Sequence, residues 1–329
     1  MSVLSSVLST EHSQKKQQTQ EQKQQQQKSQ TEQLALTLGC VATGKTVLKQ
    51  RYMSYPLSVS PIFRLDKRSQ PPQENTRGIT DVDPAQRAYL YRMNTSPGLL
   101  AGDVLRMSLT LEEGSSLLLA DQAATKVHTM PLDGPLDKRL AKVHYEIEVG
   151  DRATLEFLPE PLILFTDSAL KQTTDITLHP SAGLTWGEII LPGRLARGER
   201  YQFQEYLSRV QIKLDDDTVW FVEAVKLLGK TNPFAHSELF ASGSVLGSLI
   251  LALPQEMATR ENLTVVSQQI DRLSETSAML EVASSVLPGE RGLFVRAIAS
   301  TTRDLQSAFK AAANCIRHLR NQSPLPYSL

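Results

Sequence analysis

Three strand–turn–strand units recur along the middle of the chain, and they constrain the fold more than any other feature of the sequence. The segments around Gly114, Gly150 and Gly183 read LTLEEGSSLLL, YEIEVGDRATLEF and ITLHPSAGLTW, and these glycines are 36 and then 33 residues apart. Each segment has the alternating apolar residues of half-buried strands on both sides of a turn. Units repeated at such a spacing can stack and bury faces that no single unit buries alone. Chance similarity is the alternative, because strand–glycine–strand patterns are common in β proteins.

The segment before these units carries a complete phosphate-loop signature, but its surroundings favour a hairpin. Gly39, Gly44, Lys45 and Thr46 match G-x-x-x-x-G-K-[ST]. A phosphate loop requires a helix that begins at the lysine, so that the helix N-terminus faces the phosphates. The residues after Thr46 read TVLKQRYM and lack a helical apolar stripe, whereas every second residue is apolar over 34–40. We therefore expect a β-hairpin turn, and a nucleotide-binding protein using Gly39–Thr46 is the alternative function.

The two ends of the chain differ in character from the middle. Residues 13–33 are dominated by glutamine and offer almost no apolar side chain to bury, which predicts a disordered tail over 1–33. Helical periodicity occurs only near 257–274 and 302–320, with Thr302 as the expected N-cap of the second helix and Arg317 near its C-terminal dipole. We expect one mainly β domain over 34–329, a layered or helix-like stack of strands with two helices near the C-terminus.

Composition excludes several classes of protein. The 35 basic and 35 acidic residues cancel, so no net field draws the chain to nucleic acid or to an anionic membrane. No apolar run has the length of a membrane span, and the N-terminus has no basic signal-peptide region. The two cysteines suggest neither a disulfide framework nor a zinc site, which fits the reducing cytoplasm.

The titratable residues do not form a recognisable metal cage. The six histidines form no HxxH or HExxH pattern, although His128, His144 and His179 fall on or beside expected strands, where one could line an interior passage. Carboxylates stand at the ends of apolar runs at Asp121 and Asp167. No nucleophile elbow of the G-x-S-x-G type is present, which argues against a serine hydrolase. We expect no catalytic residues.

Two glycine-rich segments present carboxylates in informative places. In NTSPGLLAGDVLRM, Asp103 stands at the start of a strand after a tight turn. In WGEIILPGRLARGERYQF, Glu188 lies on an otherwise apolar strand, where a carboxylate is costly unless it is paired or solvated. Of the two carboxylates, Glu188 is therefore the stronger candidate for a functional residue.

Five segments together resemble the urease accessory protein family UreD, also called UreH. They are GKTVL, SPGLLAGDVL, DQAATKV, LEFLPEPLILF and WGEIILPGRLARGERY, in the family's order and spacing. The resemblance extends from about Leu34 to the C-terminus. This chain departs from the family pattern at Pro97-Gly98, at Ala101 and at Val127, where the family usually has Gly-Gly, a glycine and an aromatic residue.

The resemblance implies a non-catalytic scaffold that binds urease apoprotein. With the accessory proteins UreF and the GTPase UreG, such a scaffold would help to deliver nickel, which it would handle transiently without a tightly bound cofactor. The family is thought to carry the ion through an internal passage, and under this resemblance Asp103, Asp167 and Glu188 are candidate conduit or interface positions. Carboxylate oxygens hold Ni²⁺ weakly enough to release it, whereas a histidine or cysteine cage would trap it.

Overall fold

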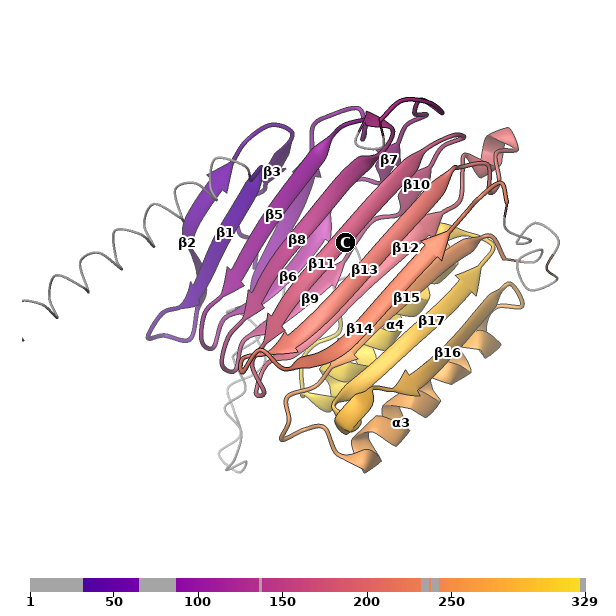
Figure 1. Cartoon of the computed structure of the whole chain (residues 1–329). Helices are drawn as coiled ribbons and strands as arrows, with labels where there is room; N and C mark the ends of the chain where they lie inside the picture. The colour runs from indigo at the N-terminus through magenta and orange to yellow at the C-terminus, as the bar shows by residue number, and fades with distance from the viewer. Residues whose placement is uncertain (1–31, 65–86, 136–137, 232–236, 238–242, 326–329) are drawn as a thin grey trace, which may run out of the picture.

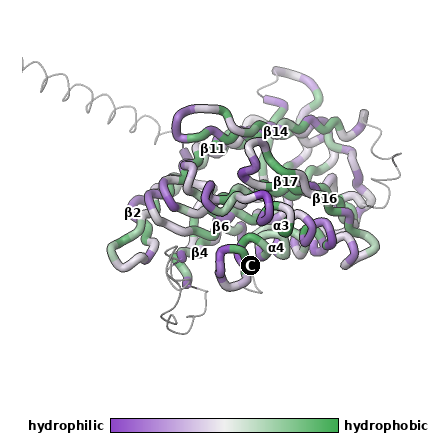
Figure 2. Tube along the Cα trace, turned by 90° about the horizontal axis from the view of Figure 1, so that it is seen from below, coloured by the Kyte–Doolittle hydropathy of each residue, from purple (hydrophilic) through white to green (hydrophobic). Residues whose placement is uncertain are grey.

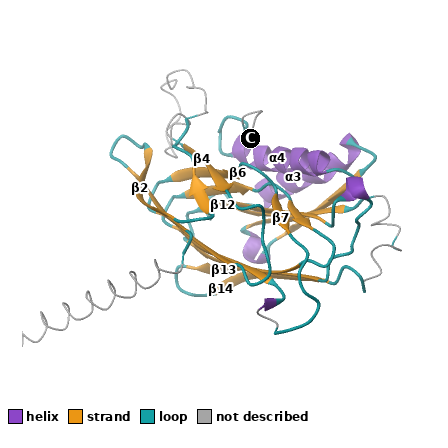
Figure 3. Ribbon diagram, turned by 90° about the horizontal axis from the view of Figure 1, so that it is seen from above, coloured by secondary structure: helices purple, strands orange, loops and turns teal. Residues whose placement is uncertain are grey.

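Two β-sheets face each other, and two helices cover the outer face of one of them (Figures 1 and 3). The computed structural model describes residues 32–64, 87–135, 138–231, 237 and 243–325. Nearly all of the predicted N-terminal tail, residues 1–33, lies outside these ranges. The division into this tail and a single β domain over 34–329 stays a prediction.

The first sheet has the strand order β14-β13-β11-β8-β5-β1-β2. The strands β1, β5, β8, β11 and β13 run parallel, and β2 and β14 pair antiparallel at the two edges. The bounds are β1 (Leu34–Cys40), β2 (Thr46–Met53), β5 (Val104–Leu111), β8 (Ala141–Val149), β11 (Ala169–Leu178), β13 (Glu205–Leu214) and β14 (Val219–Leu227).

The second sheet has the order β16-β17-β15-β12-β9-β6-β4-β3, with β7 and β10 paired beside β12. The strands β4, β6, β9 and β12 run parallel, and antiparallel strands extend the sheet on both sides. The bounds are β3 (Leu57–Val59), β4 (Ala88–Asn94), β6 (Ser116–Asp121), β7 (Thr125–Val127), β9 (Thr154–Leu158), β10 (Leu162–Leu164), β12 (Gly183–Leu191), β15 (Val245–Ala252), β16 (Leu280–Val286) and β17 (Gly292–Ala299).

The three repeated units wind from one sheet to the other and stack, as their spacing predicted. The pairs β5–β6, β8–β9 and β11–β12 each place the first strand in the first sheet and the second strand in the second sheet. Hydrogen bonds join neighbouring turns: the Gly150 amide donates to the Leu111 carbonyl at 2.8 Å, and the Gly183 amide donates to the Ala153 carbonyl at 3.0 Å. The prediction of a mainly β, helix-like stack is confirmed.

The phosphate-loop signature forms the turn of a hairpin. β1 and β2 pair antiparallel, and Gly44 takes a φ of 79° that favours glycine. Thr46 is the first residue of β2, and its buried hydroxyl accepts a hydrogen bond from the Ser116 amide at 2.9 Å. A strand therefore follows Lys45, where a phosphate loop requires a helix N-terminus.

Two helices near the C-terminus pack together against the second sheet (Figure 3). They are α3 (Arg260–Asp271) and α4 (Thr302–Leu319), and the short 3-10 segments are η3 (Leu195–Arg197), η5 (Arg272–Thr276) and η6 (Pro288–Glu290). The N-cap of α4 is Thr301, whose hydroxyl accepts from the Asp304 amide at 3.1 Å, so the expected cap at Thr302 was wrong by one residue. None of the helices in the described ranges combines the length and apolar character that crossing a membrane requires.

Two apolar layers hold the molecule together. One lies between the sheets, and the other lies between the second sheet and the two helices. In strands of the first sheet such as β8, buried and more exposed side chains alternate, because successive side chains point to opposite faces, whereas β6 and β12 in the second sheet are buried along most of their length. Figure 2 shows hydrophobic and hydrophilic segments along the chain. Inward-facing positions are therefore expected to be apolar, and polar side chains among them mark a functional candidate.

Candidate functional site: a polar cavity between the sheets

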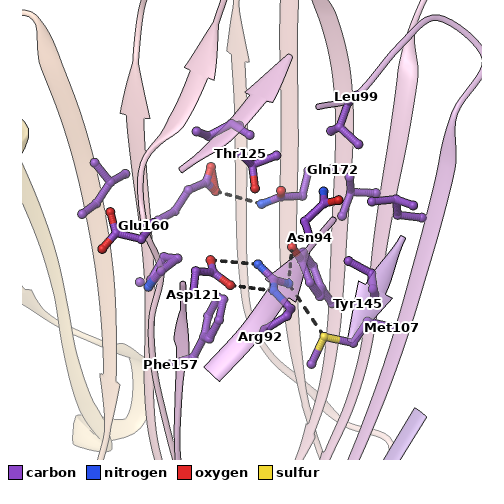
Figure 4. A pocket seen from close by; sticks show the side chains of 18 of the residues that line it. Arg92, Asn94, Leu99, Met107, Asp121, Thr125, Tyr145, Phe157, Glu160 and Gln172 are labelled. Carbon is purple, nitrogen blue, oxygen red and sulfur yellow. Dashed lines mark hydrogen bonds and ion pairs between the residues drawn. The ribbon is translucent and has the colours of Figure 1, made fainter. Parts of the chain in front are cut away.

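A cavity of about 60 Å³ lies between the two sheets, and we call it the intersheet cavity. Its lining combines apolar side chains with the polar side chains of Arg92, Asp121, Glu160, Gln172 and Glu188. Because one water molecule needs roughly 10–15 Å³ of such volume, the cavity has room for a small ion with a few waters. Figure 4 shows Arg92, Asp121, Glu160 and Gln172 converging from different segments of the chain.

Glu188 projects from β12 into this cavity and meets three neutral donors. The Tyr206 hydroxyl donates to its Oε1, the Ser208 hydroxyl donates to its Oε2 at 3.0 Å, and Gln172 Nε2 donates to the same oxygen at 3.4 Å. Burial raises the pKa of Glu188, and the Tyr206 and Ser208 hydrogen bonds offset only part of that effect. Without a cationic partner among these three contacts, the carboxylate suits a bound proton or a passing cation.

Arg92 and Asp121 form a second polar group in the same cavity. The guanidinium makes two hydrogen bonds to the carboxylate, 2.6 Å from Nε to Oδ1 and 2.9 Å from Nη2 to Oδ2. Arg92 Nη1 also donates to the Tyr145 hydroxyl at 2.9 Å, and the guanidinium carbon lies 5.3 Å and 5.2 Å from the ring centroids of Tyr145 and Phe157. Burial alone would lower the pKa of Arg92, but Asp121 and Tyr145 outweigh it and raise that pKa.

Two further cavities adjoin the intersheet cavity. The α4-side cavity, of about 200 Å³, lies between helix α4 and the ends of β6 and β9, and it shares Asp121 and Glu160 with the intersheet cavity. The edge cavity, of about 490 Å³, lies between β14 and β15–β17, and it shares Glu188 with the intersheet cavity. We call these three neighbouring cavities the row, and carboxylates are among the residues that the intersheet cavity shares with each neighbour.

Each outer cavity contains its own charged contacts. Gln306 on α4 donates to Glu160 Oε2 at 3.1 Å, and burial raises the pKa of Glu160 although this hydrogen bond opposes the rise. In the edge cavity, Arg296 on β17 forms an ion pair with Glu223 on β14 and thereby connects the two sheets. Aliphatic side chains supply much of the remaining lining of the edge cavity: Ile190, Val225, Leu227, Leu246, Val282 and Ile298.

The arrangement is suited to transient contact with a cation. Within the described ranges, no three His, Cys, Asp or Glu side chains are grouped so that they could hold a metal ion. Single carboxylates along the row offer hard oxygen ligands one or two at a time, which gives weak binding to a divalent metal. Trp186 also lines the intersheet cavity, and its Nε1 is buried without a hydrogen-bond partner.

The structure separates the three residues predicted from the sequence. Glu188 lines two of the cavities, whereas Asp103 and Asp167 lie outside the lining of all three. Asp103 accepts a hydrogen bond from the Leu100 amide at 2.8 Å and so closes its own turn. Asp167 has a φ of 59°, forms an ion pair with Lys230 and is 22% exposed at its side chain.

Sequence reasoning did not assign Arg92, Asp121 and Glu160 to this site. Asp121 stands at the end of an apolar run, and that position is the sequence signal that could have assigned it to the site. Arg92 and Glu160 gave no comparable signal, because their meeting with Asp121 depends on the pairing of β4, β6 and β9. Of the three histidines considered, His144 is in the lining of the intersheet cavity, with its Nδ1 2.7 Å from the Thr173 hydroxyl.

Comparison with known proteins places the chain in a family. The family model described as "UreD urease accessory protein" matches residues 30–328. The urease accessory protein UreD of Trichodesmium erythraeum is 44% identical over 298 residues, which cover 90% of this chain and 98% of that protein. The corresponding proteins of Actinobacillus pleuropneumoniae serotype 5b and Paenarthrobacter aurescens are both 28% identical, over 88% and 74% of this chain and 98% and 82% of their own lengths. The chain belongs to the UreD family of urease accessory proteins.

Proposed function

We propose that this chain is a non-catalytic urease maturation factor that binds urease apoprotein and assists the delivery of nickel to its active site. It acts in the cytoplasm as a scaffold, or chaperone, together with UreF and the GTPase UreG. Membership of the UreD family supports a role in urease maturation. The finer assignment of partners rests on the family resemblance and that of nickel on the geometry of the interior, and the experiments below test both.

The observation that carries the nickel assignment is the position of Glu188. This carboxylate lines both the intersheet cavity and the edge cavity, and neutral hydroxyl and amide groups supply its hydrogen bonds. An ion in the intersheet cavity meets Glu188 where this cavity adjoins the edge cavity, and this carboxylate is not bound by a guanidinium in the contacts described above. Isolated carboxylates bind Ni²⁺ and release it again, as a cargo requires.

Asp103 and Asp167 have a different place in this proposal. Both stand in loop segments outside the cavities, so we assign them to a partner interface rather than to the conduit. Their replacement by asparagine should weaken co-purification with partner proteins while it leaves nickel transfer by the remaining complex intact.

The test is co-expression of urease subunits, UreF and UreG with and without this chain, followed by measurement of urease activity and bound nickel. We expect a co-purifying complex and active urease only when the chain is present. Glu188→Gln keeps the size of the side chain and removes its charge, and it should lower the nickel content of urease roughly tenfold without loss of the complex.

The matched control is Glu112→Gln, because Glu112 pairs with Lys49 on the surface, away from the cavities. Full urease activity without the chain would refute the maturation role. Unaltered nickel loading with Glu188→Gln would remove Glu188 from the conduit and leave the maturation role standing.

A further inference from the structure

The junction between the α4-side cavity and the intersheet cavity is built differently from the junction at Glu188. Asp121 and Glu160 line both cavities there, so any small ion that moves from one to the other passes these two carboxylates. At Glu188 the hydrogen-bond donors are neutral and the nearby Arg296 is paired with Glu223, but at this junction a permanently charged guanidinium binds the carboxylate itself.

Arg92 is fixed in this position by contacts on several sides. Its guanidinium binds both oxygens of Asp121, donates to the Tyr145 hydroxyl and lies near the faces of the Tyr145 and Phe157 rings. The side chains of Arg92 and Asp121 are only 10% and 6% exposed. In Figure 4, Asp121 lies between Glu160 and Arg92, so one face of the pair is turned towards the second carboxylate of the junction.

This arrangement changes what the junction offers to a cation. A carboxylate with both oxygens bound to arginine has lost most of its capacity as a metal ligand, and the guanidinium itself repels a divalent ion at short range in a water-poor interior. Glu160 remains, but it is hydrogen-bonded to Gln306 and partly buried. The junction therefore contains two carboxylates, but a cation there meets far less negative charge than two free carboxylates would provide.

We propose that Arg92 closes this junction to divalent cations by occupying Asp121, so that an ion in the intersheet cavity is held at Glu188 and leaves through the edge cavity. Arg92 is thus a residue that determines where the ion binds and in which direction it can leave. This inference rests on the proposed function, in which the interior handles nickel, and it adds the control of its path.

The test measures binding of Ni²⁺ alone, added as the chloride, to the purified full-length chain by titration calorimetry. Arg92→Met removes the charge, retains an unbranched side chain and releases Asp121, so Ni²⁺ should bind about tenfold more tightly than to the unaltered chain. Arg92→Lys keeps the positive charge but can bind only one Asp121 oxygen at a time, so its affinity should lie between those of the unaltered chain and Arg92→Met. The double variant Arg92→Met with Asp121→Asn removes the released carboxylate and should return the affinity to that of the unaltered chain.

Equal affinity of Arg92→Met and the unaltered chain would overturn the proposal, provided that circular dichroism gives the same strand content for both. Tighter binding that persists in the double variant would overturn it too, because Asp121 would then not be the ligand. If Arg92→Met does not fold, two double variants replace it in the test: Arg92→Met with Asp121→Asn, and Arg92→Gln with Asp121→Asn. Neither of them leaves a buried carboxylate without a partner. In those two variants a rise in affinity, with Asp121 already replaced, would likewise refute the assignment.

This experiment can fail independently of the proposed function. If the affinities follow the predicted pattern but urease matures fully without the chain, the closed junction stands and the maturation role falls. If the chain is required for maturation but Arg92→Met does not alter the binding of Ni²⁺, the maturation role stands and the closed junction falls.

Discussion

A single buried glutamate connects the C-terminal helix to the rest of the protein. Glu156 on β9 is 3% exposed and lies between Arg317 on α4 and Arg87, which directly precedes β4. Arg317 binds both of its oxygens, with 2.7 Å from Nε to Oε1, and Arg87 Nη1 lies 3.3 Å from Oε2. Burial by itself would raise the pKa of Glu156, but the two arginines outweigh it and lower that pKa to about 2.

Glu156→Gln should therefore destabilise the protein strongly, because it leaves two buried guanidinium groups without their anion. Removal of one partner from a buried ion pair costs about 3–5 kcal/mol. Urea unfolding at pH 7 measures the loss. Glu112→Gln, which removes one partner of the exposed pair with Lys49, is the control and should cost less than about 1 kcal/mol.

The same substitution should flatten the acid dependence of stability. The folded pKa of Glu156, about 2, lies below the unfolded value, so its contribution is present above the unfolded pKa and decreases as the pH falls towards 2. Between pH 5 and pH 3 the unaltered protein should lose roughly 1.5 kcal/mol more than Glu156→Gln. Equal losses for both proteins would contradict the assigned ionisation.

For single residues, the sequence predicted which side chains are buried better than it predicted which side chains they contact. The isolated carboxylate of Glu188 on an apolar strand was recognised because alternation showed that it faces inward. Arg317 was interpreted as a partner of the helix dipole, whereas it is fully buried against Glu156, which is 161 residues earlier in the chain. Partners so distant depend on strand pairing, and a periodic pattern does not contain that information.

Among the elements, the turns between paired strands keep the repeated units in register. Gly150 begins the turn between β8 and β9, and its amide donates to the Leu111 carbonyl of the preceding unit at 2.8 Å. A Cβ added at Gly150 would lie 2.9 Å from that same carbonyl oxygen. The neighbouring turn approaches too closely for any side chain.

Gly150→Ala should consequently weaken the stack by about 1–3 kcal/mol, because backbone of the preceding unit has to move. Gly187→Ala is a suitable control, since its Cβ would come closest to the Leu249 and Pro159 side chains, at 3.3 Å. Thermal unfolding of both variants measures the difference. A smaller loss for Gly150→Ala than for Gly187→Ala would show that the contact between turns is unimportant.

The elements themselves were largely predictable, and the pairing between them was not. The hairpin, the three units and both helices follow from alternation, turn residues and helical periodicity, all of which are local properties. The short strands β3, β7 and β10 were not predicted, because three residues are too few to establish a period. Alternation also does not reveal that the central strands run parallel in both sheets.

For the molecule as a whole, the two apolar layers share the second sheet. Ile189 and Ile190 follow each other on β12, and they belong to the layer beneath the helices and to the layer between the sheets respectively. The ion pairs of Glu156 also connect α4 with Arg87, the residue before β4, although the two are far apart in the sequence. Loss of the helices would therefore expose one face of the sheet on which the inner layer depends.

We accordingly expect the folded part of the chain to unfold as one cooperative unit. Scanning calorimetry should give a single transition with equal calorimetric and van't Hoff enthalpies, the signature of two-state unfolding. Glu156→Gln should lower the midpoint of that transition without dividing it, because the helix layer and the strand stack cannot separate without exposing the second sheet. Helix loss that precedes strand loss in the variant, detected by circular dichroism during heating, would show instead that α3 and α4 form an independent layer on a self-sufficient stack of strands.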